Sequence, residues 1–473
     1  MPSDDLCFLG AAVLTRLYAA GDLSPVEVTR AVLQRLDALQ PQLNAFVTRT
    51  PELAMESAQR AERAYRGGEP RGVLAGVPVS LKDLFHTRGI RTTAGSRQLR
   101  ALVPQEDATV TARLHAQGAV LIGKCNMLEL AYGEVHDDYG PTRNPYGADY
   151  SAGGSSSGSA ASVAAGIGCI SYGSDTGGSI RLPAAYCGVV GLKPTYGLIS
   201  RHGVVPLSWS LDHVGPLTRT VADAALALDA VAGYDPKDPT SARTTSRSYL
   251  QALTETPEGL TVGILRSEIE LSRPVVRSAV EAALTVIEGL GVRLREIELP
   301  SIAKVAPALF GILLPEASAA LEPYLQETPQ DFSAPVRERL EMGLRVTAVD
   351  YLRSQRFRAK LTEELNRLYA DVDLIVLPTA TDIATPTGAP RSQHAQDEDP
   401  MGPLIRRTGL SNLTGHPALS IPCGFSPEGL PVGLQILAPA LHERRLLKLA
   451  AAYESAAGFS SRRPNLPFPD LKE

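Results

Sequence analysis

Three short segments carry residues that together could perform acyl transfer. Lys82 closes the apolar run of residues 76–82, Ser155 lies in GGSSSGS, and Ser179 follows two glycines in GSDTGGSIR. A serine hydroxyl is a weak nucleophile until a base can accept its proton. A lysine can be that base when burial lowers its pKa from about 10.4 toward neutrality. The three residue types are therefore those of a serine hydrolase with a lysine base.

The turn before Ser179 favours this serine as the nucleophile. Two consecutive glycines let the backbone amides point into one space, which is what stabilisation of an oxyanion requires. Each segment alone also has a plainer interpretation. A lysine after a strand is often an exposed charge, and a Gly/Ser run can be a phosphate-binding nest or a simple turn.

The combination and order of the three segments resemble the signature of the amidase family. In this resemblance Lys82 corresponds to the family's base, Ser155 to its bridging serine and Ser179 to its nucleophile. Similarity continues in GKCNMLELAYG, TRNPY and SLDHVGPLTRTVADAA, and more weakly in NLTGHPALSIPCGF. The resemblance covers most of the chain and implies a Ser-Ser-Lys hydrolase.

The resemblance implies a mechanism that uses no metal and no cofactor. Neutral Lys82 would take the proton of Ser179 through Ser155, and the Ser179 oxygen would attack the acyl carbon. A cis peptide bond is implied between Gly154 and Ser155. The developing oxyanion would be held by the backbone N–H groups of Thr176, Gly177, Gly178 and Ser179.

Residues around the signature receive weaker assignments. Tyr132 and Gly133 match a family segment that often lines the acyl pocket, although core packing is an equal alternative. Asp175 and Arg181 flank Ser179, and we interpret them as braces of the turn. Trp209, the only tryptophan, is expected in the core.

We expect a stand-alone amidase that hydrolyses a carbon–nitrogen acyl bond in an amide, an anilide or a carbamate. Its partner would be a small-molecule substrate, without nucleic acid or membrane, and a homodimer would fit the usual symmetry of oligomers. The alternative is the glutaminase subunit of the glutamyl-tRNA(Gln) amidotransferase, which has the same catalytic core. Residues 402–412 contain no acid that would grip glutamine, which favours the stand-alone enzyme.

Two other motifs are set aside. Residues 154–158 also satisfy G-x-S-x-G with Ser156 at the centre, but the preceding RNPYGADYSAG is not the apolar strand that such an elbow needs. Residues 118–125 nearly spell a P-loop, yet Cys125 stands where a serine or threonine should bind magnesium.

The composition is that of an ordinary soluble protein. The 473 residues are 44% hydrophobic and 21% charged, with a formal net charge of -5, which does not suggest nucleic-acid binding. The start of the chain lacks the basic and apolar regions of a signal peptide, and no long uncharged apolar stretch occurs. Five scattered cysteines fit neither a disulfide framework nor a zinc site. These features favour the cytoplasm.

The elements that must position the chemistry predict one α/β domain over residues 1–473. We expect a central mixed, largely parallel twisted sheet with helices on both faces, residues 71–220 as the catalytic core, and residues 300–370 as a helical subregion over the active site. A helix should start after Ser24 and end at Pro41. Strands are predicted at residues 373–378 and as a neighbouring pair within 417–439.

Overall fold

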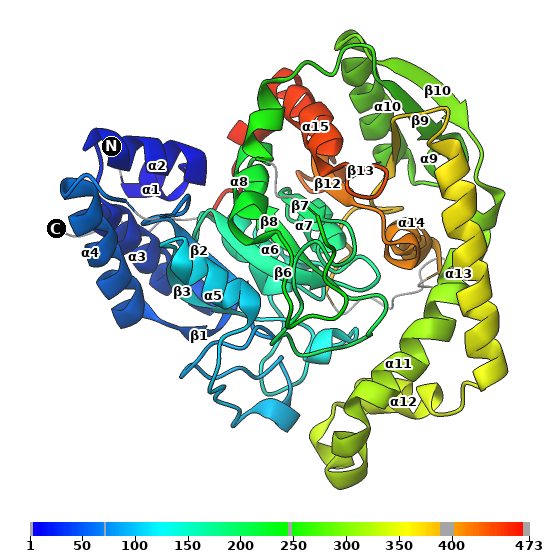
Figure 1. The fold of residues 1–473 in the computed structure, drawn as a ribbon, viewed down its shortest axis with the longest axis horizontal. Helices are drawn as coiled ribbons and strands as arrows, with labels where there is room; N and C mark the ends of the chain where they lie inside the picture. The colour runs from blue at the N-terminus through cyan, green and yellow to red at the C-terminus, as the bar shows by residue number, and fades with distance from the viewer. Residues whose placement is uncertain (1–2, 71, 245–247, 388–401, 467–473) are drawn as a thin grey trace.

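An eleven-stranded sheet runs through the middle of the molecule, and helices pack on both of its faces (Figure 1). This computed structural model describes residues 3–70, 72–244, 248–387 and 402–466. The predicted α/β fold with a large mixed central sheet is confirmed. In spatial order the strands are β1 (Phe46–Arg49), β3 (Val120–Cys125), β2 (Pro78–Lys82), β6 (Ile170–Asp175), β8 (His213–Thr218), β7 (Val190–Lys193), β12 (Ala418–Phe425), β13 (Pro431–Leu437), β11 (Leu374–Pro378), β9 (Thr261–Leu265) and β10 (Arg293–Ile297).

Parallel pairing lies on the two flanks of the sheet. β2 pairs in parallel with β3 and β6, and β9 pairs in parallel with β10 and β11. A parallel pair needs a crossover, which α5 (Thr109–Ala116) supplies between β2 and β3 and α10 (Pro274–Gly289) between β9 and β10. The middle strands pair antiparallel, including the predicted neighbours β12 and β13. A separate two-stranded sheet joins β4 (Arg143–Asn144) and β5 (Gly147–Ser151).

Helix α3 (Pro25–Leu43) shows how local signals succeed and where they stop. Ser24 caps it as predicted, because its side chain accepts hydrogen bonds from the amides of Val26 and Glu27. The predicted end was two residues short. Pro41 lies inside the last turn, where the buried Leu43 keeps the helix packed, and Asn44 then ends it in a left-handed conformation.

The remaining helices surround this sheet. They are α1 (Ser3–Cys7), α2 (Ala11–Ala20), α4 (Pro51–Arg66), α6 (Ser157–Ala164), α7 (Arg181–Tyr186), α8 (Val221–Val231), α9 (Arg266–Glu270), α11 (Val305–Glu327), α12 (Ala334–Gly343), α13 (Ala348–Leu368), α14 (Gly402–Thr414) and α15 (Glu443–Ala457). α11, α12 and α13 lie together at the lower right of Figure 1, in green to yellow. Residues 300–370 are mainly helical, and their role as a subregion over the active site stays a prediction.

Helix α11 is long and apolar, and it packs close to the predicted nucleophile turn. It packs against α12, α13 and α14. Its Leu309 side chain lies close to Gly177 in the predicted nucleophile turn, since a Cβ atom added to that glycine would be 3.7 Å from Leu309. Among the described residues, Pro300–Glu327 has the length and apolar composition that a membrane span would need, with half of its apolar window buried inside the molecule.

Candidate active site

Lys82 is the last residue of β2 and is completely buried. Its Nζ donates hydrogen bonds to Ser155 Oγ at 2.7 Å and to Ser174 Oγ at 2.8 Å. Burial lowers the pKa of Lys82 from 10.5 to about 7, although Asp175 and Asp212 oppose the shift. A lysine in this state can release and accept a proton near neutral pH.

Ser155 lies between the two other segments. The peptide bond between Gly154 and Ser155 is cis, as the sequence resemblance implied. The amide of Ser156 donates to the carbonyl oxygen of Ser179 at 3.2 Å, which ties the Ser155 segment to the Ser179 turn. The structure thus brings Lys82, Ser155 and Ser179 into one region from three separate stretches of sequence.

Ser179 stands in a tight turn between β6 and α7 and is partly exposed. The turn depends on Gly178, which has φ +132°, a region that side chains disfavour. A Cβ atom there would also meet Thr408 Oγ1 at 2.5 Å. A partly exposed serine that is tied through the Ser155 segment to a buried lysine is placed as a serine nucleophile needs to be.

The four predicted oxyanion donors differ in availability. The amide of Gly178 donates to Asp175 Oδ1 at 2.8 Å, so this N–H is already engaged. The amides of Thr176, Gly177 and Ser179 donate to no acceptor within the described part of the chain. The geometry therefore leaves three of the four amides open to a substrate oxygen.

Asp175 and Arg181 form a buried pair that braces this turn. The Asp175 carboxylate accepts from the amides of Gly178 and Ile180 and from the Arg181 guanidinium. Burial alone would raise the pKa of Asp175, but the Arg181 charge and the hydrogen bonds of Arg181 and Asn412 hold it well below the usual range. Other donors of Arg181 reach Thr408, Ser411, Asn412 and Gln435.

Substituting Arg181→Met should therefore lower the free energy of unfolding by about 3–5 kcal/mol, because it leaves the Asp175 charge buried without its partner. Denaturant unfolding of the purified protein measures this. Arg353→Met is the matched control, since Arg353 pairs with Asp350 on the exposed face of α13 and its loss should leave stability nearly unchanged. Equal stability of both variants would contradict the bracing role.

Tyr132 and Gly133 both pack against the side chain of Arg339. Tyr132 is buried in the main hydrophobic cluster, and its carbonyl oxygen accepts a hydrogen bond from Arg339 at 2.6 Å. Burial raises the pKa of the Tyr132 hydroxyl, and the Arg339 charge partly offsets this. Neither residue lines the pocket that Ser174, Leu207 and Asp212 border, whereas Ala131 does. Contact of these two residues with a substrate stays a prediction.

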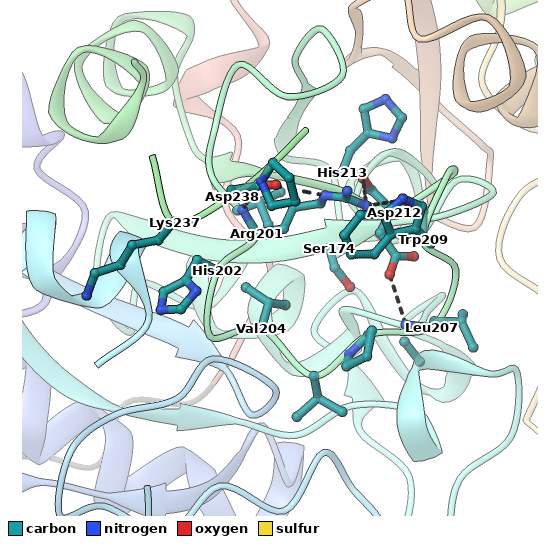
Figure 2. A pocket seen from close by; sticks show the side chains of 15 residues that line it. Ser174, Arg201, His202, Val204, Leu207, Trp209, Asp212, His213, Lys237 and Asp238 are labelled. Atoms are coloured by element: carbon teal, nitrogen blue, oxygen red, sulfur yellow. Dashed lines mark hydrogen bonds and ion pairs between the residues drawn. The ribbon is translucent and has the colours of Figure 1, made fainter. Parts of the chain in front are cut away.

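That pocket has a volume of about 230 Å³ and is lined by residues of the 201–214 and 237–239 segments together with Ser174 (Figure 2). Lys82, Ser155 and Ser179 are not among its lining residues, and Ser174 is the contact between the pocket wall and Lys82. Its wall includes Ser174, whose hydroxyl bonds to Lys82, together with Leu207 and Asp212. Trp209 also lines it and is 59% exposed, so the expectation of a core tryptophan was wrong. The guanidinium carbon of Arg201 lies over the Trp209 ring, 5.4 Å from the centre of that ring.

Several functional neighbours were missed by sequence reasoning. Ser174 and Asp212 sit inside the quoted motifs GSDTGG and SLDHVGP, so a signal existed but no role was assigned to it. Asn412, which donates to the carbonyl and carboxylate oxygens of Asp175, lies in the weak motif NLTGHP. Among the described residues, no group of three or more His, Cys, Asp or Glu side chains is arranged to hold a metal ion.

The fold, the buried lysine and the glycine-rich serine turn define a hydrolase of carbon–nitrogen bonds. The pattern of the family described as Amidase matches residues 27–447, and the chain belongs to the amidase signature family. A solved bacterial aryl acylamidase of that family is similar, with a TM-score of 0.87 and 27% identity over 98% of this chain and 99% of its own.

Two curated relatives carry a more particular description. The A subunit of glutamyl-tRNA(Gln) amidotransferase from Thermosynechococcus vestitus (strain NIES-2133 / IAM M-273 / BP-1) is 39% identical, over 96% of this chain and 99% of its own. The protein of the same description from Carboxydothermus hydrogenoformans (strain ATCC BAA-161 / DSM 6008 / Z-2901) is 38% identical, over 98% and 100%.

These relatives overturn two expectations. The chain was expected to be a stand-alone hydrolase of an amide, anilide or carbamate, and to have only a small-molecule partner without nucleic acid. Its relatives are instead subunits of an enzyme named for a tRNA substrate. The expectation rested on the lack of an acid in residues 402–412, but tertiary structure can bring carboxylates from elsewhere.

Proposed function

We propose that this protein is the glutaminase subunit of a glutamyl-tRNA(Gln) amidotransferase. The observation that carries the proposal is identity of about 39% with such subunits along nearly the whole length of both chains. The matched regions cover 96–98% of this chain, so they extend well beyond the catalytic signature. An enzyme of this kind acts in the cytoplasm, with the other subunits and an aminoacylated tRNA as partners.

The proposed chemistry is release of ammonia from the side-chain amide of glutamine. Ser179 Oγ attacks the amide carbon, and its proton passes through Ser155 to the neutral Lys82. The open amides of Thr176, Gly177 and Ser179 stabilise the oxyanion of the tetrahedral intermediate. The relay then returns the proton to the departing ammonia.

Water completes the cycle. It attacks the acyl carbon of the Ser179 ester, loses a proton through the same relay, and releases glutamate with the serine regenerated. Support for these roles comes from the contacts of Lys82 Nζ with Ser155 and Ser174, from the partial exposure of Ser179 and from the availability of the three amides. Tyr132 and Gly133 are proposed only as neighbours of the acyl pocket.

The test combines the chain with the other amidotransferase subunits encoded in the same genome. The complex receives glutamine labelled with ¹⁵N in its side-chain amide, together with glutamyl-tRNA(Gln) and ATP, which activates the carboxyl group. We expect glutamate release and ¹⁵N in the tRNA-linked product, with neither in a complex carrying Ser179→Ala. Hydrolysis of simple amides without any use of glutamine, with or without the other subunits, would overturn the proposal.

A further inference from the structure

The loop of residues 207–212 is held by a buried carboxylate at its inner side. Asp212 Oδ2 accepts hydrogen bonds from the amides of Leu207 at 2.9 Å and Ser208 at 3.0 Å. Asp212 Oδ1 accepts from Thr176 Oγ1 at 2.7 Å. One side chain thus connects this loop to Thr176, the first residue of the turn that carries Ser179. Figure 2 shows Asp212 and Leu207 side by side at the pocket.

A second carboxylate holds the same loop from the outer side. Glu316 of α11 accepts hydrogen bonds from Ser208 Oγ at 2.5 Å, from the Ser210 amide at 2.9 Å and from Ser210 Oγ at 2.8 Å. It also accepts from the Tyr351 hydroxyl of α13 at 2.9 Å. Arg358, two turns further along α13, donates to the Ser210 carbonyl oxygen at 3.0 Å.

These contacts form a continuous path from the helices to the oxyanion turn. It runs from α11 and α13 through Glu316 to Ser208 and Ser210, then through Asp212 to Thr176. We propose that Glu316 is a positioning residue, which sets the placement of the Thr176 amide by fixing the 207–212 loop. The inference rests on the proposed role of Ser179 as nucleophile, but not on glutamine as the substrate.

The physical reason is that oxyanion donors act only when they are held in place beforehand. A donor aimed at the developing charge needs no reorganisation during the reaction, and a misplacement of about 1 Å can be costly. The Thr176 side chain is oriented by Asp212 alone among its described partners. Loosening the loop at Glu316 therefore loosens Thr176, although Glu316 itself lies outside the turn.

The test variant is Glu316→Gln. Its single carbonyl oxygen can accept from only one of the two pairs of donors, so the NH₂ group must replace the carboxylate oxygen that now accepts from the Ser210 and Tyr351 hydroxyls. Those hydroxyls must turn to accept instead, and the negative charge that strengthens all four hydrogen bonds is lost. Glu322→Gln is the matched control, because Glu322 lies exposed on the same helix. The purified full chain is used in all cases, with Ser179→Ala to show which residue reacts.

The readout is the rate at which an alkyl fluorophosphonate modifies Ser179, followed by intact-protein mass spectrometry. The Ser179 oxygen–phosphorus bond forms, the phosphorus–fluorine bond breaks, fluoride leaves, and the proton passes through Ser155 to Lys82. The negative phosphoryl oxygen uses the oxyanion donors. We expect Glu316→Gln to lower the maximal rate by about tenfold, with the half-saturating reagent concentration within about twofold and Glu322→Gln unchanged.

A double-mutant cycle separates positioning from general damage. Thr176→Val keeps the backbone amide but removes the hydroxyl that bonds to Asp212. If Glu316 acts through this bond, the double variant should react no more slowly than the slower single variant. The proposal would be overturned if the rate losses of the two single variants multiplied in the double variant. It would also be overturned if Glu316→Gln reacted as fast as the unmodified chain. If Glu316→Gln fails to fold, Tyr351→Phe takes its place in the same cycle with the same two criteria.

The outcome is distinguishable from failure of the proposed function. If the unmodified protein never reacts at Ser179, then Ser179 is not the nucleophile and this inference fails as well. Reaction at Ser179 with the expected cycle, but no use of glutamine by the assembled complex, refutes the amidotransferase role and leaves the role of Glu316 standing.

Discussion

Replacing Ser179 with alanine should reduce glutamine hydrolysis by the assembled complex by about 10⁴-fold or more, because no other group can form the acyl-enzyme. The turn itself should survive. Its shape comes from Gly178 and from the Asp175–Arg181 pair, and the Ser179 side chain makes no hydrogen bond within the described residues. The melting temperature should therefore stay close to that of the unmodified protein, and steady-state kinetics should show the loss in kcat.

Ser156→Ala is the discriminating control for this experiment. Ser156 is the centre of the alternative G-x-S-x-G motif, but its hydroxyl is buried and donates to the carbonyl oxygen of Ser174 at 3.2 Å. The variant keeps the Ser156 amide that bonds to Ser179, so we expect activity within about tenfold of the unmodified level. An inactive Ser156→Ala beside an active Ser179→Ala would restore the elbow interpretation.

Lys82→Met should lower kcat by about 10³-fold, which is the usual scale for loss of a general base. Methionine is similar in size and has no charge to bury, so the variant should be at least as stable as the unmodified protein. Lys124→Met offers a sharp contrast. Lys124 is equally buried in β3, but it pairs with Asp83 at 3.3 Å, and its removal leaves that carboxylate without a partner. Thermal unfolding should show a clear loss only for Lys124→Met.

The pH dependence of turnover follows from the same lysine. Only neutral Lys82 can accept the proton of Ser179, and burial places its pKa at about 7. Activity should therefore rise tenfold per pH unit below about 7 and level off above it. A rate that keeps rising toward pH 10 would show that Lys82 has an ordinary pKa in the protein, and a flat profile from pH 5 to 9 would indicate a different base.

Local patterns predicted the elements best. The start of α3 depends on Ser24 and its immediate neighbours, and the pair β12 and β13 depends on two apolar runs close together in the chain. The end of α3 depends on packing around Leu43, which no local signal describes. The order of the strands, with parallel pairs only on the flanks of the sheet, depends on contacts between distant segments and could not be predicted from local patterns.

The site divides in the same way. The resemblance placed Lys82, Ser155 and Ser179 together, and the burial of Lys82 was a condition that only the tertiary structure could supply. Glu316 could not be connected with Asp212 from the sequence, since more than one hundred residues separate them. The amidotransferase subunit was ranked only as the alternative to a stand-alone amidase, because one acid absent from residues 402–412 was given more weight than it carries beside similarity along the whole chain.

The partners of Arg181 bear on when the site can fold during synthesis of the chain. Its guanidinium is satisfied by Thr408, Ser411, Asn412 and Gln435, which are made more than two hundred residues after it. A growing chain that has synthesised the serine turn but neither α14 nor β13 lacks all four of these acceptors, and only Asp175 can then accept from Arg181. We therefore expect the serine turn to reach its final packing only after α14 and β13 have been synthesised, late in translation.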